Sequence, residues 1–268
     1  MKQQMKEDSC SSPKGPFTSV YRRVSALLFI LFALVLIPAL AVAGAVSNRG
    51  AGPPASEGKV QVGSAEESRQ VSRVVELLQD RYDKTTDISA RFRQRTFAAG
   101  DEKGVEAEGR VWFKRPELMR WEYETPEKKL IVTSGKDVYL YEEEVNQVTV
   151  ISRERFLNSE ISRAFFCGKG RLREYFKIDS ACSGPEEGLE EAKECWSLRL
   201  IPRKETPNLK ELVLHIDRKS HLIRAVTLLD QLGGRTEIVF SQIKVNSSVP
   251  DSLFHFTIPA GAEVFRLD

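Results

Sequence analysis

The stretch Gly109–Pro126, GRVWFKRPELMRWEYETP, holds two of the chain's three Trp residues together with a Phe and a Tyr. In its second half Met119, Trp121 and Tyr123 alternate with mainly charged residues. Since successive side chains of a strand point to opposite faces, this alternation predicts a strand with one aromatic, apolar face and one charged face.

The first half of the same stretch has the same character. Val111 and Phe113 share one face, and Pro116 interrupts the run, so we expect two strands that fold back as a hairpin. One side of that hairpin is strongly apolar. This side fits either the solid core of a β-sheet or the wall of a cavity for lipid, and periodicity alone does not separate the two interpretations.

Strand patterns continue on both sides of the hairpin, separated by turn residues such as those at 99–101 and 134–137. Helical spacing of apolar residues occurs only at 66–84 and 153–167. The predicted strands cover 88–94, 105–114, 118–125, 129–134, 138–142, 146–152, 172–181, 194–202, 209–217, 222–230 and 235–245. Regularly spaced antiparallel strands with few helices predict one curved sheet or barrel, with the helices covering its open mouth or face.

The N-terminal region has the features of an export signal. Arg22 and Arg23 precede a long apolar run, and Ala41-Val42-Ala43 has the small-x-small form of a cleavage site. We therefore expect a signal peptide at 1–43, a flexible Gly/Ala/Ser/Pro-rich linker at 44–68 and a folded domain at 69–268. The alternative is a retained membrane anchor at 24–43, because the apolar run is near the length that spans a bilayer.

The charge balance argues against nucleic acid as a partner. The whole chain carries 40 basic and 38 acidic residues, but the segment 1–43 contains five of the former and two of the latter. The remainder holds 35 basic and 36 acidic residues, so no basic domain is left to bind a phosphate backbone.

Three cysteines lie in the expected folded domain. Cys182 and Cys195 flank a polar turn rich in Gly, Pro and Glu, so they are the favoured disulfide pair in an oxidising compartment. A bond between Cys167 and Cys182 is the alternative. No Cys-x-x-Cys occurs and the histidines are scattered, so the sequence predicts no metal site.

Motifs of catalysis are missing from the sequence. It contains no Gly-x-Ser-x-Gly elbow, Walker loop, Gly-x-Gly-x-x-Gly or His-Glu-x-x-His. We therefore predict no catalytic residues and no cofactor, and expect a protein that is not an enzyme.

The segment from Gly109 to Val150 resembles the LolA family, periplasmic carriers of outer-membrane lipoproteins. The matching features are Gly109, Trp112-Phe113, Arg115-Pro116, Arg120-Trp121, Pro126, Ser134-Gly135-Lys136, Tyr141 and Gln147-Val148, with LLDQLGGRTEIVF and FHFTIPAGAEV further on. Their order and spacing are together more specific than any one of them.

The resemblance implies an unclosed antiparallel β-barrel with an α-helical lid over an apolar cavity. The residues then expected to line this cavity are Phe92, Val111, Phe113, Met119, Trp121, Tyr123 and Ile131. Arg115 would bond to the lid helices and steady the closed form. Implied partners are triacylated lipoproteins, an inner-membrane lipoprotein-releasing ABC transporter and an outer-membrane lipoprotein receptor, with a monomeric carrier in the periplasm.

Rival functions remain open at this stage. A retained anchor would favour a membrane-anchored periplasmic sensor or regulator with a LolA-like lipid-binding domain. The outer-membrane receptor of the same pathway would need a lipidated Cys directly after the signal, and Gly44 occupies that place.

Overall fold

The computed structural model describes residues 63–157, 172–180, 194–206 and 209–267. The predicted signal peptide or anchor, most of the linker, residues 158–167 of the predicted helix 153–167, and both Cys167 and Cys182 lie outside these ranges. Among the helices within them, none is both long and apolar enough to cross a lipid bilayer.

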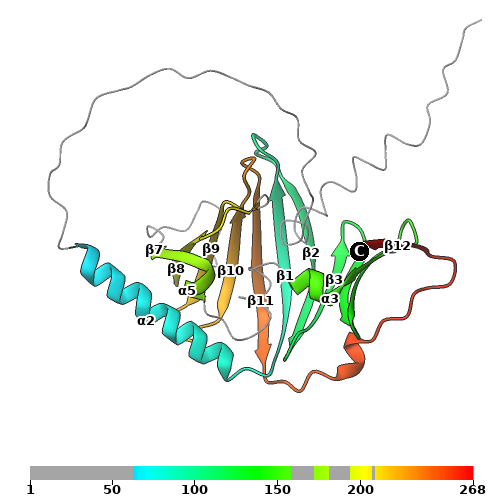
Figure 1. Ribbon diagram of the computed structural model, residues 1–268, viewed down its shortest axis with the longest axis horizontal. Coiled ribbons are helices and arrows are strands. Elements are labelled where there is room, and N and C mark those ends of the chain that lie inside the picture. The colour runs from blue at the N-terminus through cyan, green and yellow to red at the C-terminus, as the bar shows by residue number, and fades with distance from the viewer. Residues whose placement is uncertain (1–62, 158–171, 181–193, 207–208, 268) are drawn as a thin grey trace, which may run out of the picture.

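Within the described residues the strands form one sheet that does not close on itself (Figure 1). Its order is β12-β6-β5-β4-β3-β2-β1-β11-β10-β9-β8-β7. The strands are β1 Asp87–Phe97, β2 Val105–Lys114, β3 Leu118–Thr125, β4 Lys129–Ser134, β5 Asp137–Glu142, β6 Gln147–Ser152, β7 Phe176–Ser180, β8 Cys195–Pro202, β9 Glu211–Asp217, β10 Ile223–Leu229, β11 Arg235–Val245 and β12 Glu263–Leu267. An open sheet with few helices confirms the predicted fold class.

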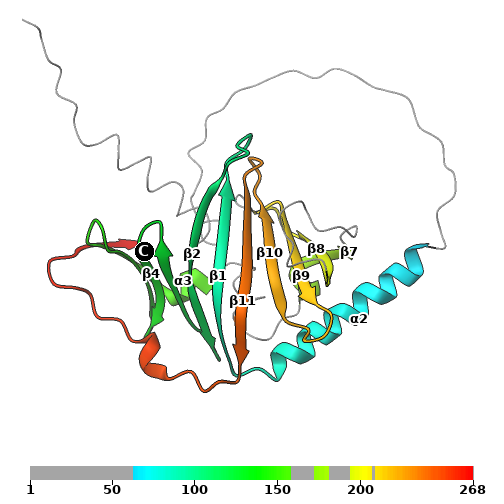
Figure 2. The same cartoon turned by 180° about the vertical axis from the view of Figure 1, so that it is seen from behind.

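Few helices accompany the sheet in the described ranges, and the longest runs along one flank of it (Figure 2). They are α2 Gly63–Asp83, α3 Arg153–Leu157, α5 Leu172–Tyr175 and the 3-10 helix η2 Asp251–Phe254. The helix expected at 66–84 corresponds to α2, and the described part of the helix expected at 153–167 is α3.

The strand predicted at 172–181 is only half right. The structure has the helix α5 first and then β7. Leu172 and Phe176 are both buried, and Tyr175 packs against the same cluster. In the helix, Leu172, Tyr175 and Phe176 at i, i+3 and i+4 share one face, and this face packs against the cluster.

The C-terminal strand β12 was not predicted, and it runs parallel to its neighbour β6. A parallel neighbour needs a long connection, and the chain supplies it between β11 and β12. In this connection Phe256 packs against Tyr139 and Tyr141 of β5. Because β12 pairs with β6 in parallel, the expectation of a purely antiparallel sheet is wrong at this edge.

One half of the sheet's inner face is covered by α2. The buried side of this helix is formed by Val71, Val74, Val75 and Leu78, which recur at helical spacing. They pack against inward-facing residues of β7 to β9, of which Leu198, Leu200, Leu212, Leu214 and Ile216 are almost fully buried. Burial of this kind stabilises the helix far more than its intrinsic propensity does.

The other half of the inner face is covered at α3. Phe156 of this short helix is only 1% exposed and packs in a second cluster. The strand residues of this cluster are Ala90, Phe92, Ala107, Val111, Met119, Tyr123, Ile131, Val138, Ile151 and Ile238. The two clusters leave room between the helices, and the candidate site lies there.

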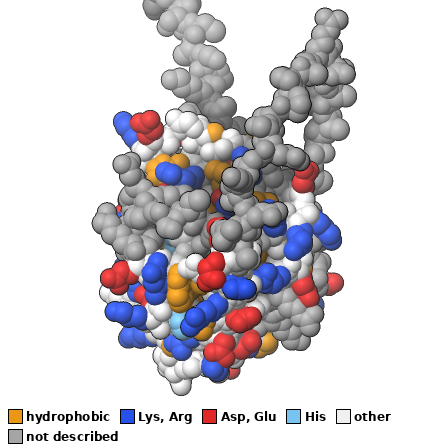
Figure 3. Space-filling view, turned by 90° about the vertical axis from the view of Figure 1, so that its left-hand side faces the viewer, with side chains coloured by type: hydrophobic (Ala, Val, Ile, Leu, Met, Phe, Trp, Pro, Cys, Tyr) orange, Lys and Arg blue, Asp and Glu red, His pale blue; other side chains and the backbone are white. Residues whose placement is uncertain are grey.

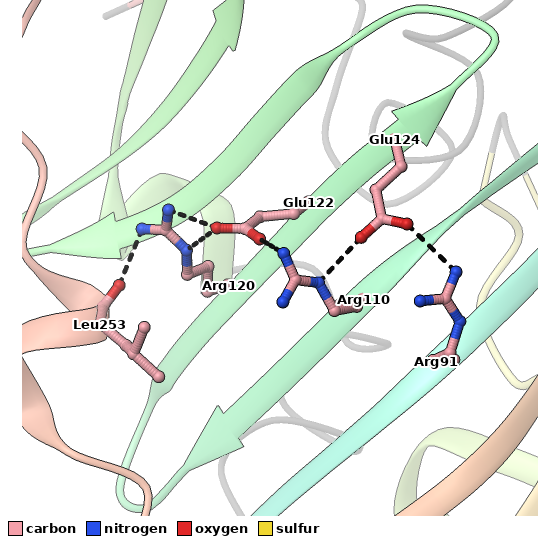
Figure 4. A network of polar contacts seen from close by, with 6 residues as sticks. All are labelled: Arg91, Arg110, Arg120, Glu122, Glu124 and Leu253. Atoms are coloured by element: carbon pink, nitrogen blue, oxygen red, sulfur yellow. Dashed lines mark hydrogen bonds and ion pairs between the residues drawn. The ribbon is translucent and has the colours of Figure 1, made fainter.

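The outer face of β1 to β3 carries an alternating ladder of charges (Figure 4). Its N···O distances run from 2.5 to 3.2 Å, and the last guanidinium also donates to the Leu253 carbonyl of η2 at 2.8 Å. The ladder consists of Arg91, Glu124, Arg110, Glu122 and Arg120. It confirms the predicted charged face of the hairpin and ties the C-terminal segment to the sheet.

Charges of both signs are also interspersed on the side of the molecule shown in Figure 3. The described surface therefore presents mixed charge in this view rather than a field of one sign.

Candidate functional site

A cavity of about 220 Å³ lies between the inner face of the sheet and the two helices. Its walls are overwhelmingly apolar, and they come from β1, β2, β3, β10 and β11, with α2 and α3 at the sides. The lining residues are Tyr82, Thr85, Thr86, Asp87, Ile88, Ala90, Val111, Phe113, Lys114, Arg115, Leu118, Met119, Trp121, Tyr123, Phe156, Leu222, Ile223, Val226, Leu228, Ile238, Phe240 and Ile243.

The hairpin of β2 and β3 forms one wall, and its register explains how. Val111 pairs with Trp121 and Phe113 pairs with Met119, so these four side chains share the inner face. Val111 and Met119 are buried, whereas Phe113 and Trp121 are half-buried at the cavity. The apolar side of the quoted stretch therefore faces a space.

Contacts between aromatic rings hold this wall together. Phe92 meets Trp121 and Tyr123 edge-on, with ring centroids 4.9 Å apart in both pairs. Phe113 meets Trp121 edge-on at 5.9 Å. Edge-to-face contacts at these distances are the favourable arrangement for aromatic pairs, so they fix ring orientations around a void that packing does not fill.

Of the seven predicted cavity residues, five line the cavity: Val111, Phe113, Met119, Trp121 and Tyr123. Phe92 and Ile131 lie in the same buried cluster but are not among the lining residues. Both are about 2% exposed and support the wall from the second row.

The opposite wall was missed by sequence reasoning. It is formed by β10 and β11, with Val226 and Leu228 on the first strand and Ile238 and Phe240 on the second. Their alternation within each strand is visible in the sequence. It gave no sign that β11 pairs with β1, because the paired residues are 138 to 157 positions apart in the sequence.

Few polar groups lie within the hydrophobic part, and those that do are satisfied. The Tyr123 hydroxyl donates to Gln94 Oε1 at 3.1 Å, and Gln94 Nε2 donates to the Thr96 hydroxyl at 3.2 Å. Burial raises the pKa of Tyr123 well above its usual range, so the phenol stays neutral. The Met119 N–H donates to the Thr133 hydroxyl at 2.8 Å, which holds the strand beneath the Met side chain.

One end of the cavity is polar and is built around Asp87. Burial acts to raise the pKa of Asp87, but hydrogen bonds from the Ser247 N–H and hydroxyl and from the Thr86 hydroxyl outweigh it and lower the pKa. Asn246 completes this corner, because its side-chain oxygen accepts from the Thr86 N–H at 2.8 Å and its nitrogen donates to the Lys84 carbonyl at 3.1 Å. The link between α2 and β1 is thereby fixed to the end of β11.

Arg115 lies at the same end, in the turn between β2 and β3. Its Nη2 donates to the Tyr82 carbonyl at 2.5 Å and lies 3.5 Å from Asp83 Oδ1, both at the C-terminal end of α2. A cation is favourable at the carbonyl end of a helix. The predicted lid contact of Arg115 therefore falls on the first of the two expected helices. Burial raises the pKa of the neighbouring Tyr82 phenol to about 12.

No described residues form a group of His, Cys, Asp and Glu that could hold a metal ion. The pair closest to catalytic chemistry is Ser197 and His215, whose hydroxyl and Nδ1 are 3.0 Å apart. His215 is 2% exposed and neighbours Val213 and Ala225 on the outer face, away from the cavity. This pair therefore does not act on the contents of the cavity.

The predicted disulfide lies partly outside the described residues. Cys182 is beyond them, and Cys195 is buried at the start of β8. The pairing of these two residues therefore stays a prediction.

An open antiparallel sheet with helices over its inner face and an apolar cavity beneath them defines the class: a lidded half-barrel with an internal apolar site. Residues 83–257, more than half of the chain, match the family described as "Outer membrane lipoprotein carrier protein LolA". The chain belongs to the LolA family.

Similar proteins include outer-membrane lipoprotein carrier proteins of two bacteria. That of Pseudomonas putida (strain W619) is 30% identical over 198 residues, which cover 74% of this chain and 87% of the relative. That of Chromohalobacter salexigens is 29% identical over 208 residues, covering 78% and 89%. The LolA superfamily protein NE2245 from Nitrosomonas europaea is similar in structure, with a TM-score of 0.37, 12% identity and coverage of 69% and 97%.

Proposed function

We propose that this protein is a periplasmic carrier that binds the acyl chains of triacylated lipoproteins released from the inner membrane. In this proposal an inner-membrane ABC transporter loads the carrier, and the carrier delivers its cargo to an outer-membrane lipoprotein receptor. The observation that carries the proposal is the apolar cavity between the sheet and its helices. The names of the relatives support the same function.

The driving force for cargo binding follows from the apolar walls. Burial of a methylene group is worth about 0.8 kcal/mol, so a chain of about a dozen methylenes gains roughly 10 kcal/mol on leaving water. Leu, Ile, Val and aromatic side chains supply the complementary surface over most of the wall. The charged lining residues Asp87, Lys114 and Arg115 lie together at one end. Hydrophobic burial has no directional requirement, so cargo proteins that differ outside their lipid can share one site.

Both loading and release require the cavity to change its volume. Its 220 Å³ is below the roughly 300–1,000 Å³ of pockets that enclose a drug-sized ligand, so several acyl chains do not fit unless the helices move. A site that is partly collapsed when empty and enlarged when loaded gives up some of the burial energy, which leaves binding reversible. Met119 suits such a wall because its flexible thioether can repack around chains of different shape.

Substitution at Met119 tests the cavity directly. Met119→Glu places a carboxyl group in the apolar wall, so we expect a folded protein that no longer keeps a triacylated lipoprotein in the supernatant after ultracentrifugation. Met119→Leu conserves size and polarity and should retain most of this activity. Circular dichroism establishes that both variants are folded. If Met119→Glu solubilises lipoprotein at the parental rate, the cavity does not hold the acyl chains.

Delivery is tested separately from binding. Loaded carrier mixed with outer-membrane vesicles should lose its lipoprotein only when the vesicles contain a lipoprotein receptor. Equal transfer to receptor-free vesicles of the same lipids would contradict receptor-dependent delivery and leave acyl-chain binding intact.

The long apolar run before Gly44 is also compatible with a second function, that of a membrane-anchored sensor or regulator that uses the same cavity. A free carrier should begin at Gly44 after export. N-terminal sequencing of the protein from the periplasmic fraction distinguishes the two, because an intact segment 24–43 in the membrane fraction would support the anchored form.

A further inference from the structure

The turn between β2 and β3 touches both helices that border the cavity. Only Arg115, Pro116 and Glu117 separate the two strands. Arg115 bonds to the end of α2 as described above, and its backbone N–H donates to the Thr86 carbonyl at 2.9 Å. Two residues further on, Glu117 Oε2 lies 3.7 Å from the Nε of Arg153, the first residue of α3.

Each helix brings one aromatic side chain to the cavity. Tyr82 lies one residue before the end of α2, and Phe156 lies in the single turn of α3. Both side chains line the cavity. In α2 the turn contacts the carbonyl of Tyr82 itself, and in α3 it contacts Arg153, three residues before Phe156. One three-residue turn thus contacts the elements that carry both side walls.

We propose that Glu117 and Arg153 form a second latch of the cavity, which acts together with Arg115 to hold α2 and α3 over it. This inference rests on the proposed carrier function, in which the helices must move apart to admit acyl chains. Because both ties originate in the same turn, displacement of that turn loosens both helices at once. Glu117 is in this view a positioning residue that makes no contact with the cargo.

The geometry of the pair suits a latch rather than a structural bond. The side chains of Glu117 and Arg153 are 32% and 34% exposed, so water and salt screen their attraction. Other contacts keep α3 folded when the pair is broken: the Arg153 N–H donates to the Lys136 carbonyl at 2.8 Å, and the Ser152 hydroxyl accepts from the Arg155 N–H at 3.3 Å. Loss of the pair therefore changes how often α3 leaves the cavity, without unfolding the sheet.

A charge-swap cycle on the full mature chain tests the latch. In the empty protein we expect Glu117→Arg and Arg153→Glu each to speed hydrogen exchange in residues 153–157 by roughly two- to fivefold. The doubly substituted protein, in which the charges are exchanged, should return toward the parental rate. Binding of 1-anilinonaphthalene-8-sulfonate, a fluorescent apolar probe, should rise in the single variants and fall again in the double variant.

Neutral substitutions guard against a misfolded charge reversal. Glu117→Gln, Arg153→Gln and their combination should all raise exchange to the same level, because removal of either partner already breaks the pair. Added salt should raise exchange in the parent and have less effect in these variants. The matched control is Glu143→Gln, since Glu143 pairs with Lys128 at the same 3.7 Å but at the far end of the β5–β6 hairpin. It should leave residues 153–157 unchanged.

The latch is overturned if the neutral single effects simply add, if the charge swap restores nothing, or if the single variants exchange at the parental rate. These measurements use the empty protein, so they are independent of cargo. If the two residues are coupled but the protein fails to bind lipoprotein in the solubility assay, the carrier function alone is refuted. Additive effects in a protein that carries lipoprotein normally would refute the latch alone.

Discussion

Replacement of Gly109 by Ala should destabilise the protein through a collision between neighbouring strands. Gly109 lies in β2 opposite Tyr123 of β3, next to a register shift. A Cβ atom at this position would lie 1.9 Å from the Glu122 carbonyl oxygen and 2.9 Å from the ring of Phe92. No ordinary rotamer change relieves the first contact, because its partner is backbone.

The size of the effect follows from these distances. An ordinary contact needs roughly 3.4 Å or more between such atoms, so β3 would have to move by more than an ångström. That movement carries Tyr123 away from Phe92 and strains its hydrogen bond to Gln94. Overpacking of this kind costs about 3 kcal/mol or more. For a domain near 200 residues, this lowers the melting temperature by roughly 6–12 °C.

Thermal and urea unfolding followed by circular dichroism measure the loss. The matched control is Gly135→Ala, since nothing lies within 4 Å of its Cβ position and its cost, about 1 kcal/mol, comes only from a positive φ of 60°. If Gly109→Ala is no less stable than Gly135→Ala, the close approach of β2 and β3 is wrong. A wrong spacing there would also remove the basis for the position of Tyr123 beside the cavity.

Three further predictions concern other features of the described fold. Tyr123→Phe removes the hydroxyl that donates to Gln94, so we expect a loss of about 1 kcal/mol in urea unfolding, and no loss would show that this bond is not formed. Burial lowers the pKa of His215, so the unfolded chain takes up a proton first as the pH falls below about 6.5, and stability declines until the folded-state pKa is passed. In that window the free energy of unfolding should change with pH less steeply in His215→Leu, by up to about 1.4 kcal/mol per pH unit. An equal pH dependence in the two proteins would contradict the desolvation of His215. Peptide mapping without reductant should find Cys182 joined to Cys195, whereas a Cys167–Cys182 peptide would favour the alternative bond.

The hairpin is the part of the fold that the sequence predicts best. Alternation placed Val111, Phe113, Met119, Trp121 and Tyr123 on the inner face correctly, because a period of two leaves only one arrangement of side chains about a strand. It failed next to the turn, where Lys114 and Leu118 were expected on the opposite face but also line the cavity. The charged set on the other face is now seen as the ladder from Arg91 to Arg120. Local pattern is enough here, since both strands and their turn lie within one short stretch.

Features that depend on distant pairing were harder to predict. The wall formed by β10 and β11 is adjacent to the hairpin only because β1 pairs with β11. The alternation of Ile238 and Phe240 does not predict which strand β11 pairs with. The strand β12 was missed for a similar reason, since its residues are mostly exposed and its place depends on a long connection. Helix α5 was mistaken for strand because Leu172 and Phe176 suit either period in so short a run.

Whether the apolar face meets a solid core or a space could not be settled by pattern. Met119 and Val111 would look the same in either case, because alternation states which side chains share a face and not what lies opposite them. The distinction depends on where α2 and α3 lie over the sheet, and local alternation does not state that.

The two ends of the sheet, β7 and β12, remain separate among the described strands, and this has a mechanical consequence. In a closed barrel the number of strands and their stagger dictate the radius, so widening it would break hydrogen bonds all around the circumference. A sheet with free margins can instead uncurl by small changes of twist shared among its strand pairs, with every ladder bond kept. In the proposed carrier, such a sheet would accommodate acyl chains of different volume at a small energetic cost.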